Sequence, residues 1–279
     1  MSPTSAMPLA PAAPAAAPDE LLEIDVVLTD RAEDVDEALE VIHDGFVEAG
    51  YMAPRRSGRR MHASYLNPGT AFVLARMDGR AVGACALIAD GPFGLPSDRA
   101  FAEENDALRA RAGRLFEGGS LSVRGDARRH TRRIMMRLAA AISRLTIVTD
   151  PTAHVVIAVT PESARFYGAM LGTCEISGVR PLYEAPAVLL RTSGTEILEH
   201  TAQRATSLQR TMDALVTETQ PSWLRDRRSH RPYPAPWLGE LLDEGPVVDT
   251  LAAQVELLAL RHPDVLARIL GRAGTRAAA

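Results

Sequence analysis

The sequence contains no lysine, only two cysteines and few aromatic residues, and all 31 of its basic side chains are arginines. Without lysine, Schiff-base and pyridoxal-phosphate chemistry and Walker-A nucleotide binding are excluded, because each needs a lysine amine. Cys85 and Cys174 lie far apart, so no CxxC redox pair or zinc site is indicated, and the seven histidines show no metal-ligand spacing. We therefore expect no metal, and a reducing cytoplasmic environment.

Long apolar runs and an excess of positive charge are also missing. The longest run of small apolar residues, Ala81 to Ala89, is half of the ~18 residues needed to span a bilayer. With 31 basic and 35 acidic residues the net charge is −4, which argues against a nucleic-acid partner held by overall charge. The 46% of hydrophobic residues is sufficient for a buried core.

Composition divides the chain into three parts. Residues 1–21 are rich in alanine and proline and are predicted to be a disordered tail. Residues 22–192 mix strand and helix patterns, and residues 193–279 show helical patterns only. Helices are expected in this last part at 197–215, 248–260 and 264–271.

The hydrophobic pattern of residues 22–192 predicts an α/β domain. Asp30 is expected to cap the first helix, and Asp78-Gly79 is a strong hairpin signal. Gly118-Gly119 interrupts a strand, which predicts a bulge or a close backbone approach. Strands are expected at 24–29, 70–77, 80–90, 115–123, 154–159, 174–179 and 187–191, and helices from 30 to about 50, from about 99 to 112, from about 126, and at 161–171.

Three segments carry a family resemblance. They are P-F-G-L-P-S-D from Pro92 to Asp98, R-L-F-E-G-G-S-L-S-V from Arg114 to Val123, and V-T-P-E-S-A-R-F-Y-G-A-M-L-G from Val159 to Gly172. With the element order, they resemble the N-acyl amino acid synthase group of the GNAT acyltransferases, which is related to the acyl-homoserine-lactone synthases. The resemblance implies a mixed central sheet splayed between two parallel strands, with a thioester-linked pantetheine donor in the split.

The same resemblance implies the catalytic groups. Acyl transfer to an amine needs a base for the ammonium proton and an acid for the departing thiolate. Glu117 stands where the family places its catalytic glutamate, and burial beside Leu115 and Phe116 would raise its pKa. Tyr167 stands where the thiol-protonating tyrosine is common. The structural alternatives are a solvated strand residue for Glu117 and a packing role for Tyr167.

Donor binding is expected at the bulged strand and at the start of the following helix. Glycine permits close approach of the donor, and main-chain amides of the strand would hold it. The second and third glycines of the usual diphosphate loop are missing after Gly125, and arginines stand there instead. This suits the single phosphodiester of an acyl carrier protein better than coenzyme A, although a solvated arginine face is the alternative. The predicted donor-binding residues are Gly119, Leu121, Val123, Arg128, Arg129 and Arg132.

The sequence therefore predicts an N-acyltransferase that moves a medium or long acyl group from acyl carrier protein, or acyl-CoA, to the amine of an amino acid. No permanently bound cofactor is expected, only the acyl-phosphopantetheine co-substrate. An arginine of the linker 51–69 would pair with a substrate carboxylate. Two alternatives stay open: an acetyl-CoA-dependent acetyltransferase and a non-catalytic module that binds carrier protein. The helical extension is compatible with simple packing, a homodimer contact or a peripheral membrane contact.

Overall fold

A mixed β-sheet forms the centre of the computed structural model, which describes residues 23–111, 113–183 and 185–228. The strand order is β6-β8-β5-β4-β3-β2-β1-β9, and β7 pairs with β8. Two neighbouring pairs are parallel in the described chain, β4 with β5 and β1 with β9. The strands are β1 (Ile24–Thr29), β2 (Ala71–Met77), β3 (Arg80–Ala89), β4 (Leu115–Val123), β5 (His154–Val159), β6 (Cys174–Glu175), β7 (Arg180–Leu182), β8 (Ala185–Ser193) and β9 (Leu224–Asp226).

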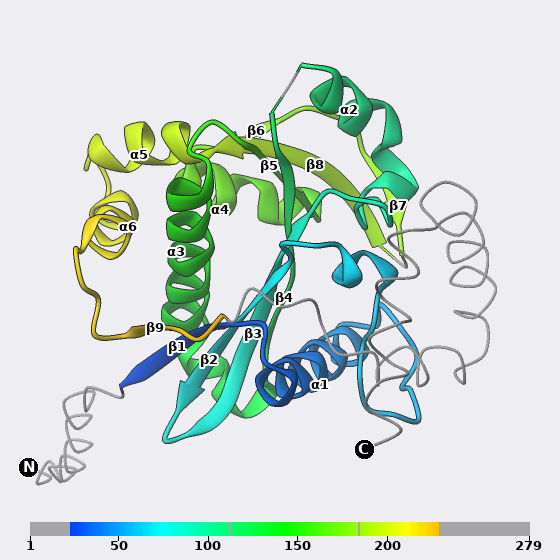
Figure 1. The fold of residues 1–279 in the computed structure, drawn as a ribbon, viewed down its shortest axis with the longest axis vertical. Helices are drawn as coiled ribbons and strands as arrows, with labels where there is room; N and C mark the ends of the chain where they lie inside the picture. Colours follow the sequence, from blue (N-terminus) through cyan, green and yellow to red (C-terminus); the bar gives the residue numbers. More distant parts are fainter. Residues whose placement is uncertain (1–22, 112, 184, 229–279) are drawn as a thin grey trace, which may run out of the picture.

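Helices cover both faces of this sheet (Figure 1). One apolar core lies between the sheet and α1 and α2, and a second lies between the sheet and α3, α4, α5 and α6. The helices are α1 (Ala32–Glu48), η1 (Ala63–Leu66), α2 (Asp98–Ala110), η2 (Gly125–His130), α3 (Thr131–Thr149), α4 (Pro161–Leu171), α5 (Gly194–Ala202) and α6 (Ser207–Thr217). The predicted α/β class is confirmed.

Local sequence signals account for several of these elements. Asp78 and Gly79 have φ values of 51° and 75°, as the predicted two-residue hairpin between β2 and β3 requires. Pro161 begins α4, where its missing N–H costs nothing, and Gly172 ends α4 with a left-handed φ of 68°. The bounds of β1, β4, β5 and α4 are those predicted.

The sheet opens between β4 and β5. Their parallel pairing joins Leu115 to His154 and continues to Glu117 and Val156, where it stops. Both strands run on beyond that point without pairing to each other. The splayed pair of parallel strands that the resemblance implied is therefore present.

The bulge of β4 lies later than predicted. Gly119 pairs with Ala86 and Ser122 with Ala84, so Ser120 and Leu121 together stand opposite Cys85. Ser120 has a φ of 58°, in the left-handed region that glycine favours, whereas Gly118 and Gly119 do not. The prediction of a bulge at the glycine pair was wrong, because a serine fixed by tertiary hydrogen bonds takes the strained position.

Three helix predictions also need correction. Arg31, and not Asp30, occupies the N-cap of α1. The helix expected from Asp126 begins at Thr131, after the 3-10 turn η2. The single helix expected at 197–215 is two helices, because Arg204 is left-handed and Thr206 starts α6 with a capping box.

The last strands and the extension also differ from expectation. The strand expected at 174–179 has two residues, and the extension contains a strand, β9, beside β1. α5 and α6 pack on α3 and α4. The tail 1–21 and the helices predicted at 248–260 and 264–271 lie outside the described residues. None of the described helices has the length and apolar character needed to cross a membrane.

Candidate active site

Two cavities meet at the split between β4 and β5. The larger, of about 230 Å³, lies on the α1 side and is lined by Glu117, Arg60 and Tyr183 among others. The smaller, of about 40 Å³, lies between the sheet and α3, α4 and α5. The two cavities share a wall, which consists of Gly118, Gly119, Leu121, Ile157 and Tyr167.

Glu117 is the buried carboxyl group of the larger cavity. It is the last residue of β4 that pairs with β5, and it is 4% exposed. Its Oε2 accepts a hydrogen bond of 2.9 Å from the backbone N–H of Ser97, just before α2. Burial raises the pKa of Glu117 to about 7, and the Ser97 hydrogen bond opposes that shift. A carboxyl group with this pKa suits a general base near neutral pH.

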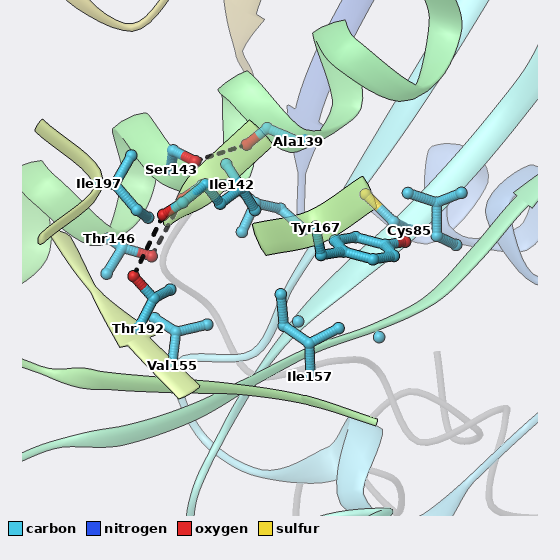
Figure 2. A pocket seen from close by; sticks show the side chains of 14 residues that line it. Cys85, Ala139, Ile142, Ser143, Thr146, Val155, Ile157, Tyr167, Thr192 and Ile197 are labelled. Carbon is cyan, nitrogen blue, oxygen red and sulfur yellow. Dashed lines mark hydrogen bonds between the residues drawn. The ribbon is translucent and has the colours of Figure 1, made fainter. Parts of the chain in front are cut away.

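Tyr167 lies on the shared wall. It comes from α4, its ring packs edge-on against Phe166 at 5.7 Å, and Figure 2 shows it beside Cys85 in the smaller cavity. Its hydroxyl has no hydrogen-bond partner among the described residues. Burial raises the pKa of Tyr167 to about 12, so the hydroxyl keeps its proton at neutral pH. Burial also raises the pKa of the Cys85 thiol, which makes Cys85 a poor nucleophile.

The predicted donor residues border the split. Arg124 donates its N–H to Val82 of β3 at 2.9 Å, and alternate residues of a strand direct their N–H groups to opposite edges. Val123 therefore presents its N–H to the β5 side. Leu121 is one of the two bulge residues opposite Cys85, and it lines both cavities. Gly119 lines both cavities, and a Cβ there would stand 3.5 Å from Glu117 Oε1.

The predicted arginines lie outside both cavities. Arg128, Arg129 and Arg132 are exposed on η2 and the first turn of α3. Arg128 forms an ion pair with Glu48 of α1, and Arg129 contacts His130 at 2.9 Å. Nothing in the described chain brings them to Glu117 or Tyr167.

Sequence reasoning missed three contributors to the larger cavity. Almost every residue has a backbone N–H, so the sequence does not indicate that the N–H of Ser97 binds Glu117. The left-handed conformation of Ser120 is unusual for serine, so the sequence does not predict it either. Tyr183 follows β7 in a turn with a φ of 56°, and its buried hydroxyl has no hydrogen-bond partner in the described part of the chain. Of the linker arginines, the structure places Arg60 in the cavity wall.

Sequence comparison identifies a family. The family described as N-acyl amino acid synthase FeeM matches residues 37–193, which is more than half of the chain. The match includes β4, β5 and α4, and so all the residues of the shared cavity wall. No curated protein matches this chain.

Solved structures share the fold. FeeM, an N-acyl amino acid synthase from uncultured soil microbes, matches with a TM-score of 0.54 and 19% identity over 68% of this chain and 98% of FeeM. BjaI, a CoA-dependent acyl-homoserine lactone synthase solved with SAM and isopentyl-CoA, matches with a TM-score of 0.51 and 20% identity over 73% and 93% of the two chains. The acyl-homoserine-lactone synthase LasI matches with a TM-score of 0.50 and 14% identity over 62% and 90%.

Proposed function

Because the chain belongs to the N-acyl amino acid synthase FeeM family of N-acyltransferases, we propose that it transfers an acyl group from a phosphopantetheine thioester to the amine of an amino acid. The observation that carries the proposal is the buried carboxyl group of Glu117 in a cavity that opens into the β4/β5 split. The acceptor enters the larger cavity, and the donor lies in the split.

In this proposal, a named side chain or backbone N–H assists each step of the acyl transfer. The Glu117 carboxylate takes a proton from the acceptor ammonium, directly or through one water, and the free amine attacks the thioester carbonyl. The N–H of Leu121 is the donor for the oxyanion that forms. As the C–S bond breaks, Tyr167 gives its proton to the thiolate, and the acylated nitrogen loses its second proton to water. A proton from water then restores the Tyr167 hydroxyl, and Glu117 releases its proton to solvent. The products are an N-acyl amino acid and the free phosphopantetheine thiol.

The donor is proposed to be acyl carrier protein, with acyl-CoA as the second option. Arg128, Arg129 and Arg132 form an exposed basic patch next to the end of β4, where a phosphopantetheine arm would leave the split. A carrier protein offers one phosphodiester and an acidic surface to such a patch. The ion pair of Arg128 with Glu48 reduces the charge that this patch presents.

The acyl chain is proposed to pass through the split into the smaller cavity. Its walls are mainly apolar, and the hydroxyl groups of its serine and threonine residues are hydrogen-bonded to backbone carbonyls, as Ser143 is to Ala139 and Thr146 is to Ile142 (Figure 2). A medium or long chain requires these walls to move apart, because about 40 Å³ is well below the ~150 Å³ of a cavity that holds benzene. This small volume favours the second candidate, transfer of a short acyl group.

A donor and acceptor matrix tests the proposal. Purified protein is incubated with pooled amino acids and with acyl carrier proteins or acyl-CoAs whose acyl chains range from roughly two to sixteen carbons. The N-acyl products are then identified by mass spectrometry. We expect an N-acyl amino acid that the Glu117→Gln variant does not form. A product from acetyl-CoA alone would favour the short-chain candidate, and a folded protein without product from any donor would overturn the proposal.

A further inference from the structure

The larger cavity contains a buried cation that forms no ion pair with a carboxylate of the described residues. Arg60 is 6% exposed and lines the cavity that holds Glu117. No carboxylate of the described residues lies within ion-pair distance of it. Many other arginines of this chain do pair with carboxylates: Arg76 with Asp34 and Glu37, Arg109 with Asp90, Asp98 and Asp106, Arg180 with Glu104, and Arg191 with Glu196.

The guanidinium of Arg60 is held rigidly. Its Nη1 donates to the Tyr65 hydroxyl at 2.6 Å and to Ser120 Oγ at 3.3 Å, and its plane lies over the Phe46 ring at 4.0 Å. The backbone N–H of Arg60 donates to Leu39 of α1. Neither Nε nor Nη2 donates to a carboxylate or a carbonyl of the described residues, and the neighbouring polar group is the Tyr183 hydroxyl. The edge that binds carboxylates in two-point contacts therefore has no anionic partner in the described chain.

A buried hydroxyl group lies beside this cation. The Tyr183 hydroxyl is buried, lines the same cavity and has no hydrogen-bond partner in the described chain. The Arg60 guanidinium carbon lies 5.3 Å from the Tyr183 ring centroid. Burial raises the pKa of Tyr183, so its hydroxyl remains a donor. A buried hydroxyl without a well-formed hydrogen bond is rare in folded proteins. Because this one lies beside a buried cation that has no carboxylate partner among the described residues, the pair indicates a missing anionic ligand.

We propose that Arg60 and Tyr183 bind the carboxylate of the acceptor, so that the enzyme acylates α-amino acids and rejects amines that lack this group. The inference rests on the proposed function, because it assigns a subsite to its acceptor. An α-amino acid carries its ammonium one carbon from its carboxylate. A carboxylate held at Arg60 therefore keeps the ammonium inside the cavity that Glu117 lines, where the base removes its proton.

Matched acceptors test this subsite without any mutation. Leucine and 3-methylbutylamine differ by the carboxylate alone, and the methyl ester of leucine keeps the shape but removes the charge. We expect kcat/KM for leucine to exceed that for either analogue by roughly 100-fold, the range of a charge-assisted two-point contact. The same acceptor series is titrated calorimetrically into the protein, which reports binding even where no turnover occurs.

Variants then assign the preference to the two residues. Arg60→Gln should remove the preference, so that kcat/KM for leucine falls roughly 100-fold further than kcat/KM for 3-methylbutylamine, which loses only what Ser120 and Glu117 owe to Arg60. Tyr183→Phe should raise KM for leucine by roughly tenfold with kcat unchanged. The exposed Arg56 provides a matched control, because Arg56→Gln removes a linker arginine outside the cavity and should change neither acceptor.

The outcomes separate this inference from the proposed function. Absence of N-acyl product with every acceptor overturns the proposed function, and calorimetry still decides the subsite. Equal binding or equal kcat/KM of leucine and 3-methylbutylamine overturns the subsite even if acyl transfer occurs. A parallel loss of both acceptors in Arg60→Gln, with the fold retained, also overturns it, because that result assigns Arg60 a structural role.

Discussion

Replacing Glu117 by glutamine should abolish acyl transfer and, above neutral pH, make the fold more stable. Glu117 is 4% exposed, and burial raises its pKa from 4.5 to about 7. At ~1.4 kcal/mol per pKa unit, this shift corresponds to about 3 kcal/mol. Glutamine keeps an oxygen that accepts from the N–H of Ser97 but carries no charge, so it removes the cost of the buried carboxylate.

The sign of this effect depends on pH. Because the folded chain binds the Glu117 proton more tightly than the unfolded chain does, its stability contribution is fully present below pH 4.5 and is lost as the pH rises to about 7. The Glu117→Gln variant lacks this loss. Its free energy of unfolding relative to the unmodified protein should therefore increase by about 3 kcal/mol between pH 4.5 and pH 7.5, and stay constant above that.

Urea unfolding followed by circular dichroism at pH 5, 6, 7 and 8 measures this difference. The exposed Glu175 supplies the control, since Glu175→Gln should follow the unmodified protein at every pH. In parallel, kcat/KM of the unmodified enzyme should rise about tenfold per pH unit up to a plateau near pH 7, and the Glu117→Gln variant should lose at least about 100-fold. A difference in unfolding free energy that does not change with pH would refute the assigned pKa, and full activity would refute the base.

Three further substitutions test the other groups. Tyr167→Phe should lower kcat by roughly 100-fold without raising the acceptor KM, and an unchanged steady-state kcat would show that the thiolate leaves without this proton. Ala139→Phe narrows the smaller cavity and should shift the preference to shorter acyl chains when donors compete in a mass-spectrometric assay. An unchanged distribution of product chain lengths would show that the acyl chain does not bind in the smaller cavity. Reversing the charges of Arg128, Arg129 and Arg132 to glutamate should raise KM for acyl carrier protein by roughly tenfold and weaken its salt dependence, and an unaffected KM would exclude this patch.

The fold could be predicted from the sequence wherever a local signal coincided with the tertiary requirement. Three signals each favour a single secondary structure over the others. They are the Asp78-Gly79 turn, the β-branched residues of β5 and Pro161 at the start of α4. The break between α5 and α6 also had a sequence signal, the capping box from Thr206 to Gln209. The signal was missed because apolar residues continue at helical spacing across the break. Helical periodicity alone does not register a single left-handed residue such as Arg204.

The site was predictable in part. The position of Glu117 and Tyr167 came from a family resemblance, and the structure places both on the walls of one cavity. The proposed carboxylate subsite was predictable only as an arginine of the linker 51–69, because the four linker arginines are equivalent in composition and only burial separates Arg60 from the others. Tyr183 lies more than one hundred residues from Arg60 in sequence, and no spacing rule connects them.

The strained residue Ser120 connects the two halves of the site. Its extra place in β4 forms the bulge that includes Leu121, a residue that lines both cavities at the split where the thioester is proposed to lie. Its side chain accepts from Arg60 and contacts the Tyr65 hydroxyl at 2.5 Å, which holds the left-handed backbone in place. Strain of this kind persists only where the surroundings determine it. One residue thereby fixes the bulge at the proposed donor site and Arg60 at the proposed acceptor site relative to each other, so the fold sets the distance between the two sites before either substrate binds.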